Sequence, residues 1–172
     1  MIMGRVRRSG SNALGVTEEL RAALRSLARL HAVDRVATRA VALVREAVGA
    51  DGAAFVIIED GLCHYAEEDG PLPGWKGQRF PITGCMAGWS VRERRLLIVP
   101  DAEADARVPH DLYAAAGVEA FIIIPLNLHP RGAALGAYWG DPQDFPAETI
   151  TALEAIARAA EGALSARKLG RR

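Results

Sequence analysis

The sequence lacks most of the features that mark specialised classes of protein. Two cysteines, Cys63 and Cys85, are too few for a disulfide framework, which favours reduced thiols and a cytoplasmic location. Basic and acidic residues number 21 each, so the composition indicates neither a nucleic-acid nor an anionic-membrane partner. No apolar run approaches the roughly 20 residues that a membrane helix needs. The N-terminal arginines precede no apolar segment, which excludes a signal peptide.

Half of the 172 residues are hydrophobic, enough for one domain with its own core and flanking helices. Glycine and serine punctuate residues 1–16, which predicts a flexible leader. We expect a single domain over residues 17–168 and a short tail over 169–172.

Helical periodicity marks both ends of the domain. Thr17 and the two glutamates after it predict a helix start, and Leu20, Leu24 and Leu27 then share one narrow face. Asp34 is placed to cap a second helix, Arg35–Val48. A last helix is expected from Ala147 to about Lys168. Because such narrow faces suit helix–helix packing, they favour a parallel homodimer, with packing inside one chain as the alternative.

Strand patterns fill the region between these helices. The runs rich in β-forming residues are Ala53–Ile58, Leu62–Glu68, Leu96–Val99, Phe121–Leu126 and Ala133–Trp139, with a further short strand entering at Arg79. Asp60-Gly61 predicts a hairpin turn, and the Gly/Pro-rich segment Asp69–Gln78 predicts a loop. Antiparallel strands with helices gathered on one side predict an α+β fold.

Three motifs in this order resemble the GAF domain family. They are Val48–Ala53 before the first strand; Gly84–Trp89 leading to Pro100-Asp101, Asp105 and Arg107; and Gly117–Leu126. The resemblance implies an antiparallel sheet of five or six strands, with the terminal helices on one face and a ligand-pocket cap on the other. It also implies a sensory or dimerisation module in signal transduction. GAF domains of bacterial sensor histidine kinases look most similar, which implies a two-component system with a kinase as partner.

The expected ligand-binding residues lie within or just before the stretch Arg79–Leu126. They are Trp75, Cys85, Trp89, Asp101, Arg107, His110 and Tyr113. Gly84 and Gly88 flank a helix start, which either offers backbone N–H groups to an anion or serves a tight turn. Cys85 at that start is either a thiol with a lowered pKa or a small buried residue.

The polar candidates have equally plain alternatives. Asp101 and Asp105 either contact a ligand or accept bonds in local turns, and Arg107 either binds or pairs with an aspartate. His110 is a ligand contact, a haem ligand or a surface residue beside a short helix capped by Asp111. Trp75 is either a pocket wall or a hydrophobic plug for its loop, and Trp89 and Tyr113 are aromatic walls or core.

Three functions compete on this evidence. The first is a non-enzymatic, dimeric sensor of an unidentified small molecule, with cofactor unknown and no metal site. The second is a structural dimerisation domain whose pocket is plugged by side chains such as Trp75, Met86 and Tyr113. The third is a reductase of free methionine sulfoxide, a GAF activity that uses three cysteines, whereas this chain has two at another spacing. Cys63-His64 resembles a bilin-anchoring pair but lies on a predicted strand, so we expect no chromophore. We also expect no cyclic nucleotide, whose signature is missing.

Overall fold

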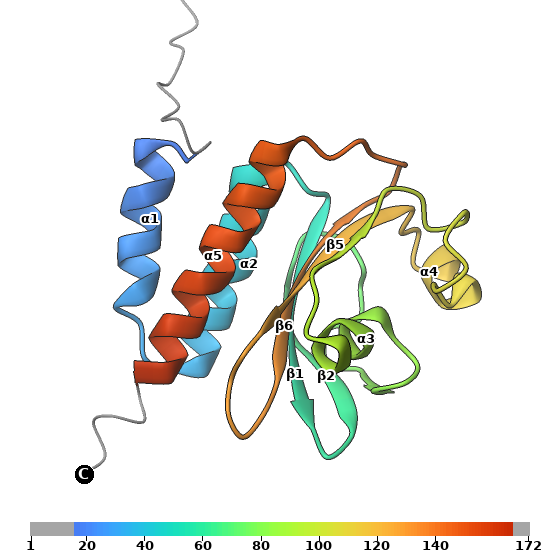
Figure 1. The fold of residues 1–172 in the computed structure, drawn as a ribbon, viewed down its shortest axis with the longest axis horizontal. Coiled ribbons are helices and arrows are strands. Elements are labelled where there is room, and N and C mark those ends of the chain that lie inside the picture. Colours follow the sequence, from blue (N-terminus) through green and yellow to red (C-terminus); the bar gives the residue numbers. More distant parts are fainter. Residues whose placement is uncertain (1–15, 167–172) are drawn as a thin grey trace, which may run out of the picture.

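The computed structural model describes residues 16–166, in which helices cover both faces of a six-stranded sheet (Figure 1). The elements in chain order are α1 (Glu18–Ala28), α2 (Val33–Val48), β1 (Gly52–Glu59), β2 (Leu62–Asp69), β3 (Arg79–Pro81), α3 (Met86–Glu93), β4 (Leu97–Val99), α4 (His110–Ala115), β5 (Ala120–Leu126), β6 (Ala133–Trp139) and α5 (Ala147–Ser165). The strand order is β3-β2-β1-β6-β5-β4, and every neighbouring pair is antiparallel. The α+β fold expected from the sequence is confirmed.

Local chemistry explains most of the element boundaries. The Thr17 hydroxyl accepts a hydrogen bond from the Leu20 amide at 3.2 Å, so the predicted start of α1 is confirmed. Asp60 and Gly61 both have positive φ angles in the β1–β2 hairpin, as a two-residue turn of that kind requires.

Two predicted helix caps are each wrong by two residues. Ala32 is the N-cap of α2, so Asp34 lies in the first turn, where its carboxylate still faces the positive end of the helix. Pro109 is the N-cap of α4, so Asp111 lies in the first turn there as well. In both cases the residue at the cap has non-helical backbone and no side-chain hydrogen bond. The cap was therefore not visible as a side-chain signal.

Alternate residues of the sheet build two separate cores. On β1, Phe55 joins the core under the helices and Val56 joins the core under the cap. On β5, Ile122 and Phe121 divide in the same way. This division follows from the two-residue period of a strand. Helices α1, α2 and α5 therefore cover one face, while α3, α4 and their loops cover the other, as Figure 1 shows.

The apolar face of α1 packs inside the chain. Leu27 is fully buried, and Leu20 and Leu24 lie against the same core, where α1 contacts α5 and α2. The predicted leader, the tail and the helix end at Lys168 fall on residues 1–15 and 167–172, outside the described range. Across residues 16–166 no helix has both the length and the apolar character that a membrane crossing requires.

Candidate functional site: an aromatic interior under the α3–α4 cap

Trp75 lies at the centre of the core between the sheet and the cap. Its loop, between β2 and β3, brings the indole within 5.1 Å of Tyr65, 5.4 Å of Phe80 and 5.1 Å of Tyr113, centroid to centroid and edge to face. The side chain is 5% exposed. Edge-to-face contacts of this kind add to the burial of apolar surface. Trp75 therefore occupies the place that was predicted for a ligand, and it fills that place from within.

Glu68 anchors the Trp75 loop to the sheet. Its carboxylate accepts a hydrogen bond from the Trp75 amide at 2.9 Å. Burial raises the pKa of the Glu68 carboxyl, while the amides of Trp75, Lys76 and Gly74 oppose that rise. The loop is thus held by a half-buried acid whose ionised form is disfavoured by its surroundings.

Three tyrosine hydroxyls meet in this interior. The hydroxyl of Tyr113 accepts a hydrogen bond from the Met86 amide at 3.3 Å, at the start of α3. The hydroxyls of Tyr65 and Tyr138 are buried, and among residues 16–166 neither has a hydrogen-bond partner of ordinary geometry. Burial raises the pKa of all three phenols. The hydroxyls of Tyr65 and Tyr138 interact with each other, yet neither makes a hydrogen bond of ordinary geometry within residues 16–166.

Cys85 lies beside these hydroxyls as the N-cap residue of α3. Cys63 lies in the same core on β2, two residues before Tyr65. Interaction with Cys63 lowers the pKa of Cys85 against the opposing effect of burial, and the amides of Gly88 and Ala87 lower it further. Both of the readings proposed for Cys85 therefore apply, because the residue is buried and its thiolate is also favoured.

Gly88 permits this approach of helix to strand. A Cβ atom at Gly88 would lie 1.9 Å from the Ile82 carbonyl oxygen, a distance that backbone atoms cannot tolerate. A Cβ at Gly84 would lie 3.4 Å from the nearest atom, the Pro81 oxygen. A steric need for glycine is therefore strong at Gly88. At Gly84 a side chain would meet only a tight contact.

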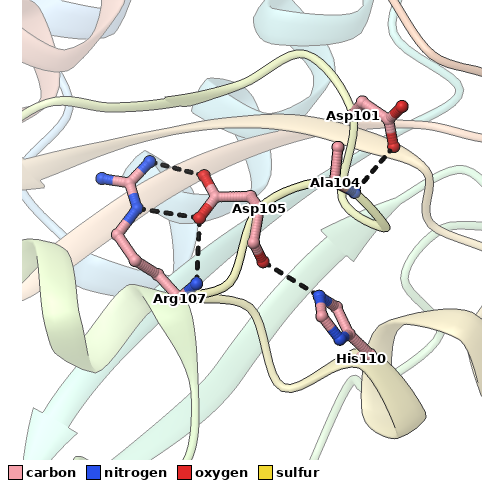
Figure 2. Close-up of polar contacts among 5 residues, drawn as sticks. All are labelled: Asp101, Ala104, Asp105, Arg107 and His110. Carbon is pink, nitrogen blue, oxygen red and sulfur yellow. Dashed lines mark hydrogen bonds and ion pairs between the residues drawn. The ribbon is translucent and has the colours of Figure 1, made fainter.

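The polar candidates form a separate cluster on the loop before α4, shown in Figure 2. Arg107 pairs with Asp105 through two side-chain contacts, at 3.0 and 2.6 Å, and His110 Nε2 lies 2.9 Å from the Asp105 carbonyl oxygen. This pairing lowers the pKa of Asp105. Asp101 accepts hydrogen bonds from the amides of Glu103 and Ala104, which is the local turn proposed as its alternative role.

Two hollows in the cap are lined by six of the seven predicted residues, of which Cys85 and Tyr113 are themselves buried. The first, about 170 Å³, lies between α3 and the loop; Cys85, Trp89 and Arg107 contribute to its lining. The second, about 450 Å³, is lined in part by Asp101, His110 and Tyr113. The sequence therefore found the residues around these hollows, except that Trp75 lies in the core beneath them. It missed Tyr65 and Cys63, although their shared strand face was visible.

Comparisons with known proteins agree with this architecture. The family model described as "GAF domain" matches residues 31–165. Among solved structures, a free methionine-R-sulfoxide reductase from Neisseria meningitidis is similar, with a TM-score of 0.77, 18% identity and coverage of 98% of this chain and 99% of that one. The GAF domain of a phosphoenolpyruvate-protein phosphotransferase from Coxiella burnetii has a TM-score of 0.74 at 18% identity, covering 94% and 100%.

A third similar structure is the phycocyanobilin-bound GAF domain of a cyanobacterial phytochrome, with a TM-score of 0.75, 17% identity and coverage of 91% and 100%. No curated protein matches the sequence. Identities this low establish a shared fold and leave the activity open.

From its resemblance to GAF domains we expected that this protein is not an enzyme. That expectation is wrong, because enzymes share this fold. The same architecture occurs in free methionine-R-sulfoxide reductases from two bacteria, N. meningitidis and Staphylococcus aureus. The physical reason for the error lies in the thiols. Their sequence spacing argued against paired thiol chemistry, whereas the fold places Cys63 and Cys85 in the same buried core under the cap.

Proposed function

This chain belongs to the GAF domain family, and from that premise we propose that it is a small-molecule-binding signalling domain. The observation that carries the proposal is the pair of buried, unpartnered hydroxyls of Tyr65 and Tyr138. A buried polar group without a partner costs about 1–3 kcal/mol. A small polar ligand that reaches these hydroxyls would recover that free energy.

We infer that a ligand would approach these hydroxyls from the hollow beside α3, although neither tyrosine lines it. Cys85 lines it and lies next to Tyr65, and the guanidinium of Arg107 stands at its edge. This guanidinium suits a carboxylate or another anionic group. We therefore infer a small polar ligand with an acidic group.

Binding would require the Trp75 loop to move, because aromatic side chains fill the interior. A ligand that prefers the open arrangement shifts the population toward it, and that shift would be the signal. The half-buried Glu68 carboxylate, which holds the Trp75 amide, is the contact that such a movement would break first.

A panel of amino acids, dicarboxylates and nucleotides tests this proposal by thermal shift. We expect at least one member to raise the melting temperature of the wild type, and Tyr65→Phe and Tyr138→Phe to reduce that rise. Arg158→Ala, an exposed change on α5, is the control that should keep it. Without ligand, the two Phe variants should be more stable than the wild type because each removes a buried hydroxyl that lacks a partner, whereas Tyr113→Phe should lose about 1 kcal/mol because the Met86 amide loses its partner.

The alternative is a structural dimerisation domain with no ligand. It is supported by the filled interior, in which Trp75, Met86 and Tyr113 are all buried. No thermal shift with any panel member would favour this alternative.

A homodimer through the terminal helices remains part of the proposal under both functions. Since α1 turns its apolar face toward α2 and α5, the contact would use the outer faces of this layer. Sedimentation at several concentrations tests it, and a mass that stays at one chain would count against it.

A cytoplasmic location and a kinase partner in a two-component system rest on the family resemblance alone. Phosphorylation assays with and without the purified domain test the kinase link.

One observation favours a second candidate, reduction of free methionine sulfoxide. That chemistry needs an attacking thiolate and a resolving thiol, and Cys85 and Cys63 lie in the same core with opposite pKa shifts. Sulfoxide consumption with dithiothreitol as reductant should be lost in Cys85→Ser. Equal consumption by the wild type and Cys85→Ser would remove this candidate.

A further inference from the structure

The six-stranded sheet ends on one side in β4, with no further strand beyond it. Among residues 16–166, no backbone group of another segment bonds to the outer edge of β4 between Leu97 and Val99. The edge closes only beyond the strand, where the Pro100 oxygen accepts a hydrogen bond from the Gln143 amide at 3.0 Å. Because alternate residues of an antiparallel strand turn their backbone groups away from the paired neighbour, β4 presents donors and acceptors that an extended segment of another chain can pair with.

The opposite edge of the sheet offers no such place. Pro81 of β3 has no N–H group, and its oxygen accepts a hydrogen bond from the Gly84 amide at 2.8 Å. The Ile82 amide in turn bonds to the Gly61 oxygen at 2.9 Å. The chain itself therefore covers the end of β3, and β4 is the open edge.

Three arginines lie at the entrance to β4. Arg92, Arg94 and Arg95 are exposed, and their side chains make no hydrogen bond or ion pair with any described residue. With Glu93 between them, three positive charges and one negative charge give this segment a net charge of +2. By contrast, the guanidinium of Arg107 on the neighbouring loop is held by a carboxylate. The guanidiniums at this corner are therefore available to an acidic partner.

The backbone at this corner places an arginine where glycine is favoured. Arg94 has φ 53° and ψ 42°, in the left-handed region that glycine adopts most easily at the end of a helix. The fully buried Ser90 fixes the next residue, because its hydroxyl donates to the Arg95 oxygen at 2.6 Å and its own oxygen accepts from the Arg95 amide at 3.1 Å. An unfavourable arginine on backbone held in this way is explained if its charge serves recognition.

Ile98 adds an apolar contact to the same surface. Among the described residues it is the one exposed large hydrophobic side chain, at 38%. Leu97 and Val99 turn into the cap-side core, so Ile98 lies on the other face of the strand. Residues 92–99 include no aromatic side chain on which a nucleic-acid base could stack. Charge, an open strand edge and one apolar side chain together favour a peptide as the partner.

We propose that the β4 edge binds an extended acidic segment of a partner protein, which adds a strand to the sheet. An apolar residue of that segment would lie against Ile98, and its carboxylates would pair with the arginines at the entrance to β4. This partner surface goes beyond ligand binding under the cap and does not depend on it, because Arg94, Arg95 and Ile98 line neither hollow of the cap.

Fluorescence anisotropy with the labelled peptide Glu-Asp-Val-Ile-Val-Asp-Glu, titrated with the full chain, tests the proposal. We expect saturable binding that weakens as salt rises and is lost when lysines replace the acidic residues of the peptide. Arg94→Ala combined with Arg95→Ala should weaken binding about fivefold, as the loss of two exposed ion pairs would. Arg29→Ala combined with Arg158→Ala removes two exposed arginines from the helix layer and should leave binding unchanged.

Two further variants separate recognition from folding. Arg94→Gly should melt no lower than the wild type, because glycine suits the left-handed backbone, and should still weaken peptide binding. Ile98→Thr keeps a β-branched residue in the strand and should weaken binding by loss of the apolar contact. Hydrogen exchange should show that the peptide protects amides within residues 96–99, as an added strand requires.

Other outcomes would overturn the proposal. These are no binding of the acidic peptide, equal losses in the two double arginine variants, or protection of amides away from β4. Single-stranded DNA that bound as tightly as the peptide would indicate a non-specific basic patch instead. Protection of residues 96–99 that rose with protein concentration alone would indicate pairing of two copies of this chain. Because the assay uses no metabolite, its failure would leave the ligand proposal intact, and a failed ligand screen would leave the peptide surface intact.

Discussion

The guanidinium of Arg107 lies 5.3 Å from the centre of the Trp89 ring while it also pairs with Asp105. One side chain thus joins the loop before α4 to the exposed side of α3, across the hollow that Cys85 lines. This contact lies on the outside of the cap, whereas the aromatic contacts of Trp75 lie in the core.

Replacing Arg107 tests that link. Arg107→Ala should lower the free energy of unfolding by about 0.5–1 kcal/mol, the size of an exposed cation–π contact, and change the fluorescence of Trp89. Arg107→Lys should lose part of this, since an ammonium cannot make both contacts to Asp105. Urea denaturation followed by tryptophan emission measures both. If Arg107→Ala changed no more than Arg158→Ala on α5, the contact would have no energetic role.

Trp75 should be among the most costly side chains of the cap-side core to remove. Trp75→Ala should lower stability by about 3–5 kcal/mol, as truncation of a buried aromatic does. Trp89→Ala, at a half-buried position, is the matched comparison and should cost clearly less. Chemical denaturation gives both values. Equal losses would contradict the central position of Trp75.

Two helical glycines should respond in opposite directions to alanine. Gly88→Ala would place a methyl group against the Ile82 carbonyl and should cost about 1–3 kcal/mol or more. Gly162→Ala meets nothing within 4 Å on α5 and should gain about 0.5–1 kcal/mol from helix propensity. Thermal melts of the two variants decide this, and a stabilised Gly88→Ala would show that α3 can move away from the strand.

The raised pKa of Glu68 predicts a particular dependence on pH. Because the folded state holds this proton more tightly than the unfolded chain does, stability from Glu68 is greatest below the ordinary value of about 4.3 and falls as pH rises through the raised pKa. Glu68→Gln keeps an acceptor for the Trp75 amide and cannot ionise. The wild type should therefore lose stability relative to Glu68→Gln between about pH 4 and the raised pKa. A constant difference across that range would contradict the assignment.

The fold was largely predictable from the sequence because its signals are local. The helical spacing of Leu20, Leu24 and Leu27 and the turn at Asp60-Gly61 depend on neighbours a few residues away. The caps of α2 and α4 were misplaced because Ala32 and Pro109 act through backbone geometry, which leaves no mark in side-chain chemistry.

The site was predictable only in outline. Residues around the hollows lie on irregular backbone between strands, and that pattern alone singled out Asp101, Arg107 and His110. The placement of Cys63 and Cys85 in one core was not predictable, since it depends on the return of the chain after β3 rather than on spacing. That the hydroxyls of Tyr65 and Tyr138 lack partners within residues 16–166 likewise depends on how the core packs. Local sequence patterns do not predict the orientation of the two phenol rings.

The sheet acts as a partition between two cores that share strands but few side chains. Phe55, Ile122 and Leu135 serve the helix layer, while Val56, Phe121 and Tyr138 serve the cap. Substitutions can therefore accumulate under the cap, altering what that side recognises, without disturbing the scaffold that keeps the chain folded. Such a division allows recognition to diverge faster than architecture, and it makes the cap side the natural place to engineer a new specificity.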